Sequence, residues 1–109
     1  MASFEARTAT APGRITLILS GDCDLTVRDK LTVALLDAVS RSTTIFVDVG
    51  GVGFLDSTGV HALVTAHHAA LARSSRLYVI NATGAVAAVL DLTGLGTLLQ
   101  APADERHHA

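Results

Sequence analysis

Hydrophobic and polar residues alternate near the start of the chain in the way that β-strands require. A weakly alternating segment at 4–10 is followed by a Pro-Gly turn signal at 11–13 and by a stronger strand at 14–20. This pattern predicts an N-terminal β-hairpin. The segment 21–25 that follows contains a glycine and two aspartates, a composition typical of turns, and predicts a loop.

Two longer segments have apolar residues at helical spacing. Thr26, with Asp29 three positions later, has the pattern of a capping box and predicts a helix that ends near Ser40. A β-branched strand at 44–49 separates it from a second helix at about 58–72. The apolar stripe of this second helix is expected at Val60, Leu63, Val64, His67, Ala70 and Leu71.

The last third of the chain repeats this order in shorter pieces. It predicts a strand at 77–80, a turn at 81–84 with a cap at Thr83, a helix at 85–92, and an edge strand at 97–101. Strands joined through helices are parallel. We therefore expect an α/β domain whose mixed sheet has four to five strands, with helices packed on it and a polar tail at 102–109.

Length and composition narrow the class of protein. A chain of 109 residues corresponds to one domain, 1–109, with a core at about 4–101. The net charge is -2 without a cluster of Lys or Arg, so neither nucleic acid nor a membrane surface is an expected partner. The lone Cys23 forms no disulfide, and no apolar run approaches the roughly 20 residues that span a bilayer. A cytoplasmic location is the resulting expectation.

Polar residues concentrate where predicted strands end. In open parallel sheets, the loops at the carboxyl ends of strands share one edge, where ligands bind. Three loops meet this condition: 21–25, with Asp22 and Asp24; 50–57; and 81–84. The second loop leads into the helix through the sequence Asp-Ser-Thr-Gly.

The residues Asp56, Ser57 and Thr58 have two explanations. Each is a preferred helix N-cap, which is the simplest reason for finding one of them at a helix start. A helix needs only one N-cap residue, whereas this segment offers three. A phosphate on a hydroxyl at this position would be stabilised by the helix N-terminus. The neighbouring glycines match neither a P-loop nor a dinucleotide fingerprint, so no cofactor is expected.

Three spaced motifs resemble a known family. They are LSGDCD at 19–24, FVDV at 46–49 followed by FLDSTGV at 54–60, and VLDLTGL at 89–95. Together they resemble the STAS domain, specifically the bacterial anti-sigma factor antagonists, over about residues 4–101. The Asp-Ser-Thr-Gly sequence is specific here because the other two motifs flank it at fitting distances.

The resemblance implies a phosphorylation switch. The residue that matches the family's phosphoacceptor is Ser57, with Thr58 as an alternative; the kinase is the partner anti-sigma factor, and a protein phosphatase reverses the modification. The unmodified antagonist binds the anti-sigma factor and so regulates sigma-factor-dependent transcription. Asp24 matches the family's rim acid. We assign Asp22, Asp56, Gly59 and His61 to the same partner-binding rim.

Alternatives remain at this stage. The same fold without a switch would be a scaffold or a small-ligand-sensing module in a signalling assembly. A hydrolase that uses Ser57 with His61 as base is disfavoured, because no orienting acid or oxyanion hole can be named. His61, His67 and His68 lack the spacing and the acid that a metal site needs. Cys23 is expected to be a small buried residue rather than a redox sensor.

Overall fold

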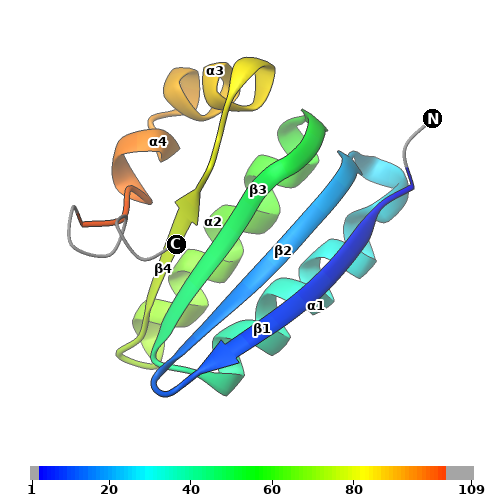
Figure 1. Cartoon of the computed structure of the whole chain (residues 1–109). Helices are drawn as coiled ribbons and strands as arrows, with labels where there is room; N and C mark the ends of the chain where they lie inside the picture. Colours follow the sequence, from blue (N-terminus) through cyan, green and yellow to red (C-terminus); the bar gives the residue numbers. More distant parts are fainter. Residues whose placement is uncertain (1–2, 103–109) are drawn as a thin grey trace.

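The computed structural model describes residues 3–102, which form a sheet with helices (Figure 1). Most of the predicted tail, residues 103–109, lies outside this range. The elements in chain order are β1 (Glu5–Ala11), β2 (Arg14–Cys23), the 3-10 turn η1 (Leu25–Val27), α1 (Arg28–Arg41), β3 (Thr44–Leu55), α2 (Ser57–Ala72), β4 (Arg76–Ile80), α3 (Gly84–Thr93) and α4 (Leu95–Leu98).

The four strands form one mixed sheet in the order β1-β2-β3-β4. β1 is antiparallel to β2, whereas β2, β3 and β4 are parallel, which confirms both the predicted hairpin and the α/β class. Figure 1 shows α1 and α2 covering one face of the sheet, and α3 and α4 lying beyond β4. Among residues 3–102, no helix covers much of the opposite face.

The core lies between the sheet and the two long helices. Alternate residues of β2 are buried, including Ile15, Leu17 and Leu19, and they face buried leucines of α1 such as Leu31 and Leu35. Burial of each such side chain contributes about 1.5–3 kcal/mol. This alternation is why β2 could be predicted from its sequence.

The apolar stripe of α2 differs from the prediction. The buried residues are Gly59, Ala62, Leu63, Ala66 and Ala70, whereas Leu71 is 42% exposed. The buried side of this helix therefore consists mainly of small residues, which let its backbone approach its neighbours closely. The predicted stripe was based on the larger apolar residues, so it lies about one residue further along the helix than the buried side.

Two predicted loops are strand. β2 runs on to Cys23 and β3 runs on to Leu55, so 21–25 and 50–57 are largely part of the sheet. The pairing of β2 with β3 shifts twice, and each shift adds one residue to β3, as in a β-bulge. A side chain at Gly51 would be crowded, because its Cβ would lie 3.0 Å from the Ser20 Cβ.

Smaller corrections concern caps and the C-terminal element. The side chain of Asp24, not Thr26, caps the first turn, and α1 begins later, at Arg28. Thr83 occupies the N-cap position of α3, but its side chain makes no capping hydrogen bond. The predicted strand at 97–101 is wrong: α4 lies there, and only Gln100 forms a bridge, with Val79.

Candidate functional site

The ends of β2 and β3 bring the sequence motifs together. Cys23 is paired with Leu55 across the two parallel strands, and the Asp56 amide donates to the Cys23 carbonyl at 3.4 Å. Asp22 and Asp24 therefore lie at the same edge of the sheet as the first turn of α2. We call this edge, with Asp22, Asp24, Asp56, Ser57, Thr58, Gly59 and His61, the acidic rim.

Asp56 is the residue that caps α2. Its carboxylate oxygen Oδ1 accepts hydrogen bonds from the backbone amides of Thr58, at 2.9 Å, and Gly59, at 3.3 Å. These are two of the amide groups that have no partner within the helix. The carboxylate also lies at the positive end of the helix dipole, which stabilises it.

The two hydroxyls of the rim differ in their surroundings. Ser57 is exposed, and its hydroxyl has no hydrogen-bond partner among residues 3–102. Thr58 is half-buried and faces a groove between α1 and α2. Since Asp56 provides the cap, neither hydroxyl is required to start the helix, and Ser57 is the more accessible of the two.

Gly59 permits the close contact between α2 and the end of β2. A Cβ at this position would lie 3.3 Å from both the Cβ and the carbonyl oxygen of Cys23, and would overlap the Leu55 side chain. Gly59 is buried. A glycine here lets the first turn of α2 lie directly against β2, as its place in the motif implies.

Three carboxylates surround a buried thiol at the rim. Cys23 is 1% exposed, and burial raises the pKa of its thiol to about 11, with further contributions from Asp22, Asp24 and Asp56. The thiol therefore stays protonated at neutral pH, as expected of a buried structural cysteine. Asp24 also has a structural role, because it accepts a hydrogen bond from the Thr26 amide at 3.0 Å.

A groove of about 470 Å³ between α1 and α2 adjoins the rim. It is lined by Arg28, Asp29, Thr32 and Val33 of α1 and by Thr58, His61, Ala62 and Thr65 of α2. His61 is exposed. The α1 residues were not predicted as part of a site, although the exposed apolar Val33 in an otherwise amphipathic helix was a usable signal.

Two exposed apolar side chains flank the acidic rim. Leu25, which follows Asp24, is 64% exposed, and Phe54, two residues before Asp56, is 48% exposed. Large apolar side chains beside polar groups are common in protein interfaces. Neither side chain is predicted from the sequence, because each lies in a segment that has the composition of a loop.

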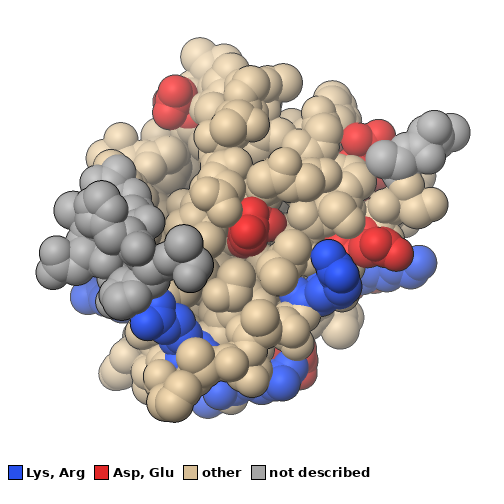
Figure 2. Space-filling model, viewed as in Figure 1, with Lys and Arg blue, Asp and Glu red and all other residues tan. Residues whose placement is uncertain are grey.

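Charges are distributed unevenly along the molecule. Arg14 and Arg76 stand at the starts of parallel strands, both paired with Thr44, and Arg41 and Arg73 close α1 and α2. In Figure 2 the Lys and Arg side chains lie in the lower half of the view, below most of the acidic ones. The carboxyl end of the sheet carries Asp22, Asp24 and Asp56 and is the more acidic end, although Arg28 and Lys30 at the start of α1 lie near it.

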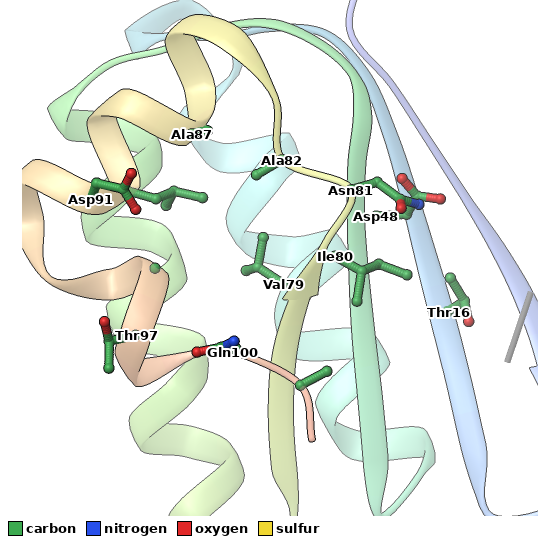
Figure 3. Close-up of a pocket in the computed structure, with 13 residues that line it drawn as sticks. Thr16, Asp48, Val79, Ile80, Asn81, Ala82, Ala87, Asp91, Thr97 and Gln100 are labelled. Carbon is green, nitrogen blue, oxygen red and sulfur yellow. The ribbon is translucent and has the colours of Figure 1, made fainter. Parts of the chain in front are cut away.

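The third predicted rim loop lies elsewhere. β4 ends opposite Asp48, while β3 continues beyond this point to Leu55. Asn81 consequently lies beside Gly50 and lines a separate hollow of about 800 Å³ (Figure 3). This hollow lies between the end of the sheet and α3 and α4.

The histidines of α2 make no joint site. His67 and His68 lie with their ring centroids 5.6 Å apart, and burial lowers the pKa of His67, with His68 and Arg76 adding to the effect. His67 is half-buried. Among residues 3–102 there is no group of three potential metal ligands and no helix long and apolar enough to cross a membrane.

Comparison with known proteins identifies the family. The family model described as Mlab, STAS domain, matches residues 6–100 of the chain. The chain belongs to the STAS domain family. No curated protein sequence matches this STAS domain.

Solved structures share the fold of this STAS domain. An anti-sigma factor antagonist from Mycobacterium paratuberculosis has a TM-score of 0.82 and 21% identity, covering 95% of this chain and 91% of that one. The anti-sigma factor antagonist SpoIIAA in its unphosphorylated form has a TM-score of 0.75 and 22% identity, with coverages of 94% and 91%. SpoIIAA from Bacillus in its phosphorylated form has a TM-score of 0.62 and 22% identity, with coverages of 94% and 95%.

Proposed function

We propose that this STAS domain is an anti-sigma factor antagonist switched by phosphorylation of Ser57. It binds its anti-sigma factor when Ser57 is unmodified and is released when Ser57 carries a phosphate. The observation that carries this proposal is the exposed Ser57 hydroxyl, which has no structural task because Asp56 caps the helix. A structure of SpoIIAA in each phosphorylation state shows that a protein of this fold carries such a modification.

The position of Ser57 suits a kinase. It is the first residue of α2, so its side chain projects from the end of the helix rather than from its packed side. Thr58, the alternative acceptor, is half-buried against the groove and is harder for a kinase to reach. The proposed kinase is the anti-sigma factor itself, and a protein phosphatase restores the hydroxyl.

Electrostatics explains how one phosphate reverses binding. A phosphoserine adds about -1.5 to -2 charges at neutral pH. At the acidic rim it would join Asp56 on the same helix turn and Asp22 and Asp24 at the end of β2. A partner surface that fits the neutral hydroxyl would then face added negative charge and bulk, and the fold itself need not change.

The acceptor is tested by mapping the phosphate. The chain is incubated with candidate anti-sigma factor kinases and ATP, and peptides are analysed by mass spectrometry. Ser57 is expected to be labelled in the unaltered chain and in Thr58→Val, and label is expected to disappear in Ser57→Ala. Label on Thr58 alone, or no label from any cognate kinase, would contradict the proposal.

A second candidate function keeps the fold and omits the switch. In this alternative the domain senses a small ligand within a signalling assembly, and the hollow of about 800 Å³ beside α3 favours it. Both candidates describe a binding protein in the cytoplasm rather than an enzyme. A ligand that raises the melting temperature, together with a Ser57 that no kinase labels, would favour the second candidate.

A further inference from the structure

The hollow between the sheet and α3 and α4 has the dimensions of a small-molecule site. Its volume of about 800 Å³ falls in the range of about 300–1,000 Å³ that is usual for such sites. It is lined from β2, β3, the end of β4 with the loop that follows it, α3, α4 and the segment after α4. None of these lining residues belongs to the acidic rim, so an inference about the hollow does not rest on the proposed phosphorylation switch.

The charge of the lining selects the class of ligand. Two carboxylates, Asp48 and Asp91, line the hollow, and no Lys, Arg or His among the described residues does so. A phosphate or carboxylate ligand would be repelled, which argues against nucleotides. A cation fits, because its charge would be balanced by the two carboxylates.

The carboxylates lie apart, with apolar residues between them. Figure 3 shows Asp48 on β3 at one side of the hollow and Asp91 on α3 at the other, with Val79 and Ala82 in the middle. A single compact cation held at one carboxylate would leave the other carboxylate and the apolar centre without a contact. Two cationic groups joined by methylenes can contact both carboxylates, because the methylenes between them would cover the apolar centre.

The polar groups of the hollow are available to a ligand. Asp48 accepts one hydrogen bond, from the Gly50 amide at 2.9 Å to Oδ1, which leaves its second oxygen for other donors. Within residues 3–102, the carboxylate of Asp91 and the amide groups of Asn81 and Gln100 have no hydrogen-bond partner. Such acceptors suit the several N–H donors of an ammonium group.

We propose that this hollow binds an aliphatic polyamine, with one ammonium group on Asp48 and another on Asp91. Asn81, next to Asp48, and Thr97, on the side of Asp91, complete the two ends of the site (Figure 3). The ligand makes only ionic and hydrogen-bonding contacts, and no covalent step is involved.

Calorimetric titration of the full chain tests this site. The probes are 1,4-diaminobutane and spermidine, with butylamine and ATP for comparison, at near-physiological salt. The polyamines are expected to bind, butylamine to bind about tenfold more weakly for lack of a second charged contact, and ATP not to bind. Binding of ATP in preference to polyamines, or no polyamine binding, would overturn the proposal.

Variants separate the site from general electrostatic attraction. Asp48→Asn keeps an oxygen for the Gly50 amide, and Asp91→Asn alters an exposed residue, so both are expected to fold. Each should weaken 1,4-diaminobutane binding at least about tenfold. Asp37→Asn, on α1, is the matched control and should leave binding unchanged. Equal losses in all three variants would show adventitious binding and refute the site.

A neutral substitution tests the cavity itself. Ala87 lines the hollow from α3, and Ala87→Leu adds bulk without changing charge. It should abolish polyamine binding while Ser57→Ala, at the separate rim, should retain it. Unchanged binding in Ala87→Leu, with circular dichroism showing a folded variant, would place the polyamine elsewhere and contradict the proposal.

Discussion

At the residue scale, the acidic rim depends on a division of tasks between neighbouring side chains. Asp56 caps α2, Gly59 lets the helix meet β2, and Ser57 between them keeps a free hydroxyl. The sequence alone identified this group of residues. It did not decide which of the three polar side chains caps the helix, because Asp, Ser and Thr are all good caps and the choice depends on the direction in which each projects.

Gly59→Ala tests the close contact at the rim. The added Cβ would press on Leu55 and on the Cys23 backbone, so we expect the free energy of unfolding to fall by about 1–3 kcal/mol. Urea denaturation measures the change. Gly53→Ala is the matched control, since a Cβ there meets only Asp22 Oδ1, at 3.4 Å. Equal destabilisation of both variants would contradict the steric explanation.

The buried thiol predicts a pH dependence of stability. Burial, followed by the three neighbouring carboxylates, raises the pKa of Cys23 from its ordinary value of 9.0 to about 11. The folded state therefore holds the thiol proton more tightly than the unfolded state does. The resulting stabilisation is fully present below pH about 9 and is lost as the pH rises through about 11.

Cys23→Ala isolates this contribution. Denaturation curves collected from pH 8 to 11 should show a steeper loss of stability in the unaltered chain than in the variant. The variant controls for the other groups that titrate in this range. Parallel pH profiles for the two proteins would show that the thiol pKa is not shifted.

At the element scale, the helices and strands followed from hydrophobic periodicity, whereas their ends did not. β3 continues through Gly50, Gly51 and Gly53 because bulges against β2 accommodate the extra residues, and glycine there resembled a loop in the sequence. The sequence predicts a strand at 97–101. This segment instead completes α4 and leaves a single bridge at Gln100, a tertiary outcome that a short apolar run cannot reveal.

Val33→Asp tests whether the groove between α1 and α2 belongs to the partner surface. Val33 is 67% exposed, so the substitution should leave stability nearly unchanged. The substitution removes an apolar contact and would leave a new carboxylate without a partner in the interface, so binding to the anti-sigma factor should weaken about tenfold or more, as measured by surface plasmon resonance. Leu71→Asp, at the other end of α2, is the control and should bind normally. Unchanged binding in Val33→Asp would exclude the groove from the interface.

At the scale of the whole molecule, the parallel sheet separates charge. Its carboxyl end carries Asp22, Asp24 and Asp56, and its opposite end carries Arg14 and Arg76. The shared fold covers nearly the full length of both this chain and the Mycobacterium paratuberculosis antagonist. The rim is thus the acidic end of a domain that has the size of those antagonists.

This polarity predicts that binding depends on salt. A partner that docks on the acidic rim should present basic groups to Asp22 and Asp24 and a close-fitting surface without a basic group to Ser57, and screening should slow its association as ionic strength rises. Association rates measured between about 50 and 300 mM salt should fall, whereas dissociation rates should change less. A salt-independent association rate would argue that the partner docks on another surface.

The affinity of the anti-sigma factor for the two forms of this chain tests the central claim most directly. Calorimetry would compare the unmodified chain with the same chain phosphorylated on Ser57, with Thr58→Val in both forms as the control. We expect phosphorylation to weaken binding at least about tenfold in both backgrounds, by placing about -1.5 to -2 charges beside Asp56. Equal affinity of the phosphorylated and unmodified forms would contradict the switch.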